Sequence, residues 1–233
     1  MTYHPFDFDS PAAQPATEYD VRVRQHIPGY DALLSMVAAL LQQHLSHNAH
    51  ILIVGVGSGN ELQVLSNVQS HWQFTGVDPS ENMLAVARSK VEQLGISERV
   101  TLHKGVVDDL PLQQFDAATS LLVMHFLPDD GSKLNYLQAI ASRLKPGSPF
   151  LLVDMQGDKQ SDSFKLLFEG WQTRARLAGV EPQRLTELAS RVEQHLPCIP
   201  ESRTLELLQQ TGFKNVVRFY TALILNGWLA FAE

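Results

Sequence analysis

The sequence predicts an α/β protein in which helices cover both faces of a mostly parallel β-sheet. Short apolar segments, typical of buried strands, alternate with helical segments between residues 50 and 154. Parallel neighbours need a crossover connection, usually a helix, and helices are predicted between most of these strands. The last two strands, 214–220 and 222–233, have no helix between them and must pair antiparallel. We therefore expect a doubly wound sheet that ends in an antiparallel pair.

Residues 1–47 precede the first strand and are expected to form an arm followed by a capping helix. Residues 1–18 are rich in Pro, Ala, Asp and Thr and show no hydrophobic periodicity, which is typical of an arm. From residue 31 to 45, leucine and valine recur on one helical face after a Pro-Gly turn signal. Asp31 stands where an N-cap would begin this helix.

Residues 48–233 are expected to form a single domain. Its first five strands are predicted at residues 50–54, 72–78, 99–103, 115–123 and 150–154. Helices are predicted from about residue 60, from Ser80 to Gly95, over 133–144 and over 204–210. The alternation breaks at Met155, and two amphipathic helices, 163–177 and 182–194, follow within an insert of about residues 156–196. An insert at this place is suited to cover the end of the sheet as a lid.

Composition and charge exclude several classes of protein. With 233 residues, 44% of them hydrophobic, and a net charge of −7, the chain can build a large core and is not expected to be disordered. Its single cysteine, Cys198, excludes an internal disulfide and a cysteine-based metal cluster. The sequence shows neither a long apolar run nor a secretory signal, and its acidic balance argues against a nucleic-acid partner. We expect a cytoplasmic protein with no membrane partner, and a homodimer stays open.

The strongest chemical signal is the segment Val54-Gly-Val-Gly-Ser-Gly-Asn-Glu61, directly after the first strand. Glycines let the backbone turn sharply and approach a ligand, and the helix that follows presents free N–H groups. Asp78 ends the next strand, 19 residues after Gly59, where a carboxylate binds ribose hydroxyls in nucleotide folds. The pair indicates an adenosine-type cofactor. A purely structural turn and a helix cap are the alternatives.

Motifs for other cofactors and reactions are missing from the sequence. It contains no Tyr-x-x-x-Lys, no phosphate-binding Gly-Lys loop, no Gly-x-Ser-x-Gly and no His-Glu-x-x-His. A sulfonium cofactor carries no phosphate, so it needs glycines for close approach rather than phosphate-binding groups. The glycine segment and Asp78 are therefore compatible with such a cofactor.

On these residues the chain resembles the class I S-adenosylmethionine-dependent methyltransferases over roughly residues 48–155 and 204–233. The resemblance implies a seven-stranded Rossmann-like sheet of order 3-2-1-4-5-7-6 with strand 7 antiparallel. It makes 48–233 an S-adenosylmethionine-binding methyltransferase domain, with the glycines along the methionine part of the cofactor. Asp78 would bind the ribose, and Met83 would pack near the adenine.

The resemblance extends to a stretch, 104–111, that is similar to the family's adenine loop. Val106 replaces the Asp usual there, which leaves Val107 and Asp108 as the candidates for contact with the adenine. Altogether, the residues predicted to contact the cofactor are Gly55, Gly57, Ser58, Gly59, Asp78, Pro79, Met83, Val107, Asp108, Leu121, Tyr19 and Tyr30.

A narrower resemblance is to the carboxy-S-adenosylmethionine synthases, which make a carboxymethyl sulfonium for modification of a tRNA wobble uridine. It rests on segments 24–31, 166–168 and 211–213 and on the length of the insert. That family holds the added carboxylate with an arginine before the Gly-Phe turn, where this chain has Leu207. Leucine cannot make that bidentate contact, although Arg203, one turn earlier, is a candidate substitute.

We therefore predict a methyltransferase that uses ordinary S-adenosyl-L-methionine and a small-molecule acceptor. A carboxy-S-adenosylmethionine synthase and a non-catalytic cofactor-binding protein on the same fold are the alternatives. His125 is the predicted general base because the carboxyl ends of parallel strands face the ligand crevice. Asp154 is an alternative base, and a purely structural histidine is the competing interpretation. Residues predicted to contact the substrate are His26, Trp171, Arg174 and Arg203.

A metal site is not expected. His44, His47 and His50 recur every three residues, and three imidazole groups could in principle bind zinc. However, the helix is expected to fray near Ser46, which would spoil the geometry. We interpret the three histidines as a solvated helix end.

Overall fold

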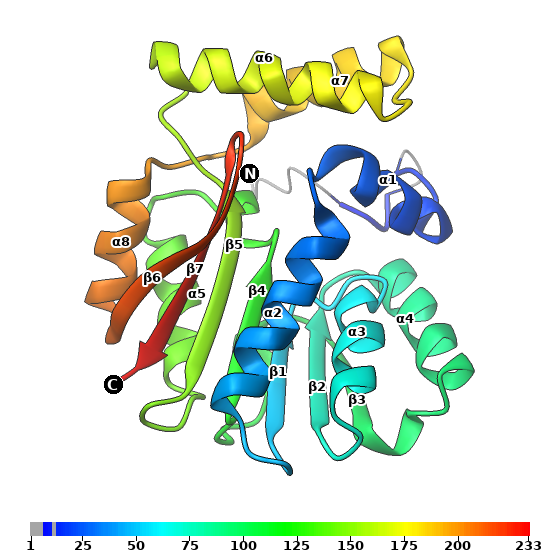
Figure 1. Ribbon diagram of the computed structural model, residues 1–233, viewed down its shortest axis with the longest axis vertical. Coiled ribbons are helices and arrows are strands. Elements are labelled where there is room, and N and C mark those ends of the chain that lie inside the picture. Colours follow the sequence, from blue (N-terminus) through cyan, green and yellow to red (C-terminus); the bar gives the residue numbers. More distant parts are fainter. Residues whose placement is uncertain (1–6, 11–12) are drawn as a thin grey trace.

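The computed structural model describes residues 7–10 and 13–233, and it contains one seven-stranded sheet of order β3-β2-β1-β4-β5-β7-β6 (Figure 1). Neighbours from β3 to β5 are parallel, and β7 runs antiparallel to both β5 and β6. The predicted fold class and strand order are thus confirmed. The strands are β1 (His50–Val54), β2 (Gln73–Asp78), β3 (Val100–Lys104), β4 (Ala117–Leu121), β5 (Pro149–Met155), β6 (Phe213–Ala222) and β7 (Leu225–Ala232).

Helices cover both faces of this sheet, as its buried central strands require. On one face, alternate residues of β1 such as Ile51 and Ile53 pack with α2 (Tyr30–His44), α3 (Asn60–Val68) and α4 (Glu81–Gln93). On the other face, Leu52 and Val54 belong to the core of α5 (Ser132–Ala141) and α8 (Glu201–Gln210). Because side chains alternate across a strand, one apolar run serves both layers.

The carboxyl ends of β1, β2, β4 and β5 lie at one edge of the sheet, since these strands are parallel. The glycine segment, Asp78 and the turn after β4 therefore meet at that edge. The fourth strand ends two residues earlier than predicted, at Leu121, because Leu122 takes a positive φ of 65°. His125 follows the strand on a short 3₁₀ helix, η4 (Met124–Phe126).

The N-terminal segment contains a helix that we did not predict, α1 (Tyr19–His26). Only Val23 of α1 is buried, so the sequence carries no apolar stripe to reveal it. The predicted N-cap is also wrong, because α2 begins after Gly29, and Asp31 instead pairs with Arg24. The arm prediction falls partly on residues 1–6 and 11–12, which lie outside the described residues.

Two helices, α6 (Asp162–Leu177) and α7 (Pro182–His195), follow β5 within the predicted insert. Figure 1 shows them lying together beyond one end of the sheet, beside α1. Their contact with α1 is anchored by Trp171, whose indole N–H donates to the His26 carbonyl at 2.8 Å. Among the described residues, no helix combines the length and the apolar character needed to cross a bilayer.

Candidate cofactor and acceptor site

The glycine segment forms a tight turn whose conformation excludes ordinary side chains. Gly55 and Gly57 have φ values of 72° and 51°, in the left-handed region that favours glycine. A Cβ on Gly55 would lie 2.3 Å from Cγ2 of Val123, so the turn after β4 packs directly against this backbone. A Cβ on Gly57 would lie 3.3 Å from the methyl of Met83. The structure thus brings the glycines and Met83 together.

Asp78 ties the end of β2 to the glycine turn. Its carboxylate accepts the Gly57 N–H at 2.9 Å and the Ser80 N–H at 2.9 Å, and it is 8% exposed. Burial raises the pKa of Asp78, and these two backbone donors oppose that effect. The Gly105 N–H donates to the Asp78 carbonyl at 3.0 Å, which places the loop after β3 beside it. Asp78 therefore shapes the turn and also stands at the edge where a ribose would lie.

Residues 7–10 of the arm dock beside Asp78. The Asp9 carboxylate accepts hydrogen bonds from the Ser80 hydroxyl at 2.6 Å and from the Glu81 and Asn82 N–H groups at 2.9 Å. These donors hold the pKa of Asp9 below its usual range. Sequence reasoning missed Asp9, because it sits in an arm without periodicity and bonds more than 70 residues away.

A polar network joins α1 and α2 to the same turn. The Ser58 hydroxyl donates to Asp20 at 2.6 Å, and Lys90 donates to both Asp20 and Asn60 at 2.7 Å. The Asn60 amide donates to the Tyr30 hydroxyl at 3.4 Å. The predicted cofactor residues Ser58 and Tyr30 are thus engaged in holding the N-terminal helices over the glycine turn.

The remaining predicted cofactor residues differ in exposure. Tyr19 is half-buried on α1, and burial together with the charge of Asp78 raises its pKa to about 12. Val107 and Leu121 are buried, whereas the Asp108 side chain is exposed. In the same loop the Asp109 carboxylate accepts the Val106 N–H at 2.9 Å, so that acid shapes the loop itself.

Glu61, the second residue of α3, is a buried acid that sequence reasoning did not assign. It is 6% exposed, and burial raises its pKa to about 7 from an ordinary 4.5. The folded protein therefore holds this proton more tightly than the unfolded chain does. The signal for it was present in the sequence, since an acid follows the glycine turn at a helix position that faces the core.

This pKa shift gives a testable pH dependence. Because the folded-state pKa is raised, the stability that the protonated Glu61 contributes is fully present below pH 4.5 and is lost as the pH rises to about 7. We expect a Glu61→Gln variant to show a smaller loss of stability over this interval than the wild type. Denaturant unfolding at several pH values would measure it, and parallel curves for the two proteins would contradict it.

His125 and Asp154 form a buried pair at the carboxyl ends of β4 and β5. Nδ1 of His125 lies 2.9 Å from Oδ1 of Asp154, and the two side chains are 5% and 1% exposed. The same carboxylate oxygen accepts the His125 backbone N–H at 3.2 Å. The other oxygen, Oδ2, has no partner among the described residues. One carboxylate thus orients both the ring and the backbone of His125.

Comparison with known proteins identifies the domain. Residues 51–147 match the family described as a methyltransferase domain. The chain is 25% identical over 211 residues to the carboxy-S-adenosyl-L-methionine synthase of Campylobacter concisus, covering 91% of this chain and 88% of the relative. It is 26% identical over 207 residues to the demethylmenaquinone methyltransferase of Lactiplantibacillus plantarum, covering 81% and 84%.

The fold agrees with solved methyltransferases. The SAM-dependent methyltransferase of Aquifex aeolicus superposes with a TM-score of 0.63 at 19% identity, over 94% of this chain and 99% of that one. The CurJ carbon methyltransferase gives a TM-score of 0.67 at 12% identity, where this chain spans 58% of the longer one. The predicted family resemblance is confirmed, and S-adenosyl-L-methionine is the cofactor of this methyltransferase domain.

Two of the predicted substrate residues hold the insert helix α6 against α1. Trp171 is fully buried with its N–H on the His26 carbonyl, and Arg174 donates to the Arg24 carbonyl at 3.1 Å. These contacts cap the carboxyl end of α1, where free carbonyls need donors. The structure therefore gives Trp171 and Arg174 a structural role. Burial and nearby arginines lower the pKa of His26 to about 4.

A core residue, Leu207, stands where the carboxy-S-adenosylmethionine synthases have their carboxylate-binding arginine. Leu207 is fully buried with α5 and the sheet. Arg203 lies on the surface of α8, where it pairs with Asp129 at 2.9 Å and Glu206 at 2.8 Å. These two carboxylates already balance the charge of Arg203, which argues against Arg203 as a replacement for the missing carboxylate-binding arginine.

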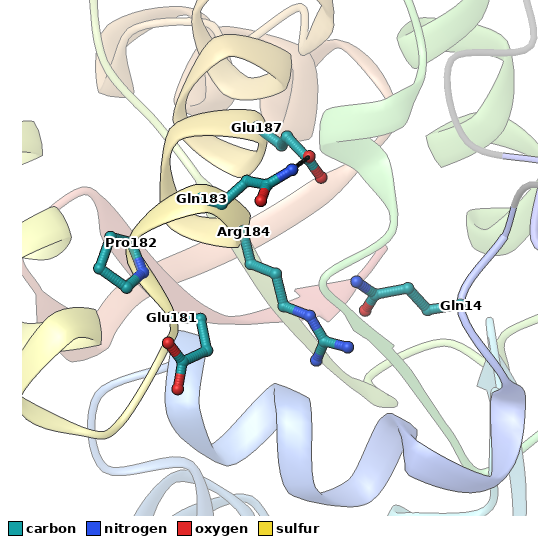
Figure 2. Close-up of a pocket in the computed structure, with 6 residues that line it drawn as sticks. All are labelled: Gln14, Glu181, Pro182, Gln183, Arg184 and Glu187. Carbon is teal, nitrogen blue, oxygen red and sulfur yellow. Dashed lines mark hydrogen bonds between the residues drawn. The ribbon is translucent and has the colours of Figure 1, made fainter.

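An open cavity of about 600 Å³ lies between the arm and the start of α7. Figure 2 shows the side chains of Arg184 and Gln14 pointing toward one another across it. Its lining residues are Gln14, Glu181, Pro182, Gln183, Arg184 and Glu187. None of them belongs to the glycine turn or to the ends of β2 and β4, so this cavity is separate from the cofactor site.

The three N-terminal histidines do not converge. The ring of His44 packs on Phe231 at 5.0 Å between centroids, and that of His47 lies 4.0 Å from His71. His50 bonds the Thr75 hydroxyl at 2.9 Å. Within the described part of the chain, no group of three His, Cys, Asp or Glu side chains is placed to hold a metal ion.

Proposed function

We propose that this methyltransferase transfers the methyl group of S-adenosyl-L-methionine to a small-molecule acceptor that gives up a proton to His125. The observation that carries this proposal is the buried His125–Asp154 pair at the edge where the glycine turn and Asp78 also lie. A general base is needed only if the acceptor must lose a proton. A hydroxyl or a similar weakly acidic group fits that requirement.

The pair supports a base in a defined tautomer. When Asp154 accepts the Nδ1–H, the proton is held on that nitrogen and Nε2 is left to accept one. The carboxylate also stabilises the positive charge that the ring gains. When bound, the cofactor supplies a methyl group on a sulfonium centre. The protein's remaining task is to align the acceptor and exclude water, which the buried setting of His125 and the helices α6 and α7 support.

The charge distribution favours ordinary S-adenosylmethionine over its carboxylated form. The acids Glu61, Asp78 and Asp154 are buried at or near this edge, and they suit a cationic sulfonium. An added carboxylate would need a cation, but Leu207 stands at the matching position and Arg203 is paired elsewhere. The net charge of −7 supports a small acceptor rather than tRNA. A cytoplasmic location and a homodimer remain predictions.

A carboxy-S-adenosylmethionine synthase is the second candidate, because such enzymes are 21–25% identical to nearly the whole chain. Mass spectrometry of the ligand that remains bound through purification separates the two. We expect S-adenosylmethionine or its demethylated product. A carboxymethyl sulfonium would reject our proposal, and failure of both compounds to bind in calorimetry would reject cofactor binding altogether.

Asp78 provides a direct test of the cofactor site. We expect Asp78→Ala to weaken binding of S-adenosylmethionine at least about tenfold, about 1.4 kcal/mol, because a ribose acceptor and the Gly57 contact are both lost. Titration calorimetry measures this change. The control is Asp162→Ala, which removes a fully exposed acid of α6. Equal affinity in Asp78→Ala and wild type would remove Asp78 from the site.

A further inference from the structure

Glu61 is a buried carboxyl group that forms no ion pair within the described part of the chain. Its Oε1 atom and the hydroxyl of the buried Thr119 on β4 have no hydrogen-bond partner of normal geometry among the described residues. The Thr119 hydroxyl nevertheless lies close enough to Glu61 to lower its pKa against the larger effect of burial. An unpaired polar oxygen in the interior costs free energy, and a charged one costs more. Lys90, which bonds the neighbouring residue Asn60, also bonds Asp20, so its charge is already engaged.

The charge of Glu61 acts on two tyrosines, Tyr19 and Tyr136. It raises the pKa of Tyr19, which the charge of Asp78 also raises. It raises the pKa of Tyr136 as well, on which Asp154 acts in the same direction. Glu61 therefore lies near Tyr19 and Tyr136, and its side chain neighbours Thr119, two residues before the end of β4. It also directly follows the turn that is expected to line the methionine part of the cofactor.

The methionine part of the cofactor carries a group that suits the unpaired oxygen of Glu61. The methionine portion carries a primary ammonium group, which has three donors and a full positive charge. We propose that Glu61 receives this ammonium group. The inference rests on the proposed use of S-adenosylmethionine and adds the residue that selects its amino-acid end. Charge-assisted hydrogen bonds of this kind are about twice as strong as neutral ones.

The proposal predicts a selective loss of affinity. Two ligands separate the amino-acid end from the nucleoside: S-adenosylhomocysteine, which has the ammonium group, and 5′-methylthioadenosine, which lacks the whole amino-acid part. We expect Glu61→Gln to weaken binding of S-adenosylhomocysteine at least tenfold and to change binding of 5′-methylthioadenosine less than twofold. Titration calorimetry measures both. The matched control is Glu98→Gln, because Glu98 is an exposed glutamate outside the site.

The outcomes distinguish a failure of Glu61 as the ammonium-binding residue from a failure of the proposed use of S-adenosylmethionine. If the wild type binds neither ligand, the proposed function fails. If the wild type binds both and Glu61→Gln leaves both affinities unchanged or lowers them equally, Glu61 only shapes the fold and the inference is overturned. Should the variant not fold, the wild type is compared with a cofactor analogue in which a hydroxyl replaces the amine. Equal affinity for the amine and hydroxyl forms would also overturn it.

Discussion

His125→Ala is expected to lower kcat about 10²–10⁴-fold, the usual contribution of a positioned general base, while the affinity for S-adenosylmethionine changes little. The reason is that His125 is bonded to Asp154 and not to the glycine turn or Asp78. Steady-state kinetics with an identified acceptor, combined with calorimetry for the cofactor, separates the two effects. Activity within twofold of the wild type would exclude His125 as a base.

Asp154→Asn provides a second test of the same pair. The amide cannot hold the imidazole in the same tautomer or stabilise its positive charge, so we expect a fall in kcat in the same direction. His103→Ala is a suitable control, because His103 lies on β3 and lines a small cavity to which neither His125 nor Asp154 contributes. A pH profile of kcat that loses its acidic limb in His125→Ala would support proton transfer over a purely structural role.

Trp171→Ala is expected to destabilise the protein by about 3–5 kcal/mol, the range seen when a buried aromatic side chain is removed. Trp171 is fully buried, stacks on Phe168 at 5.5 Å and bonds the end of α1. Loss of these contacts separates α6 from α1, which carries Tyr19 and Asp20. We therefore expect weaker cofactor binding as well. Denaturant unfolding measures the first effect, and calorimetry the second.

The control for Trp171 lies on the same helix. Leu177 is 84% exposed, so Leu177→Ala removes apolar surface without opening a cavity. Its effect on stability should stay within about 0.5 kcal/mol, as for other exposed positions. If Trp171→Ala behaved like Leu177→Ala, the anchoring of α1 by the insert would be refuted.

The central part of the fold could be predicted because its signals are local. A continuous apolar run such as residues 51–54 reports a strand buried on both faces, and Ser80 and Gly95 mark the ends of a helix. The glycine turn was predictable for the same reason. Its left-handed backbone at Gly55 and Gly57 can be formed comfortably only by glycine.

The contacts of the N-terminal region and of the insert helices could not be predicted, because residues far apart in the sequence decide them. Helix α1 buries only Val23 of its own residues, and it is held by donors from Trp171 and Arg174 almost 150 residues away. Asp9 caps α4 from an arm without any periodic pattern. Sequence spacing cannot show that Trp171 and Arg174 of the insert, which were expected to face a substrate, instead bond the carbonyls of α1.

By itself, the sequence determined the alternation of strands and helices, the glycine turn and Asp78 at the end of β2, and its resemblance to methyltransferases supplied the strand order. Those features depend on neighbours within a few residues or on a fold that the motifs imply. Only the tertiary structure decided that His125 pairs with Asp154, that Leu207 packs in the core and that Glu61 is buried with no ion pair among the residues described. These facts depend on which side chains from separate helices and strands come into contact. Burial and those contacts then set the protonation and the reactivity of each side chain.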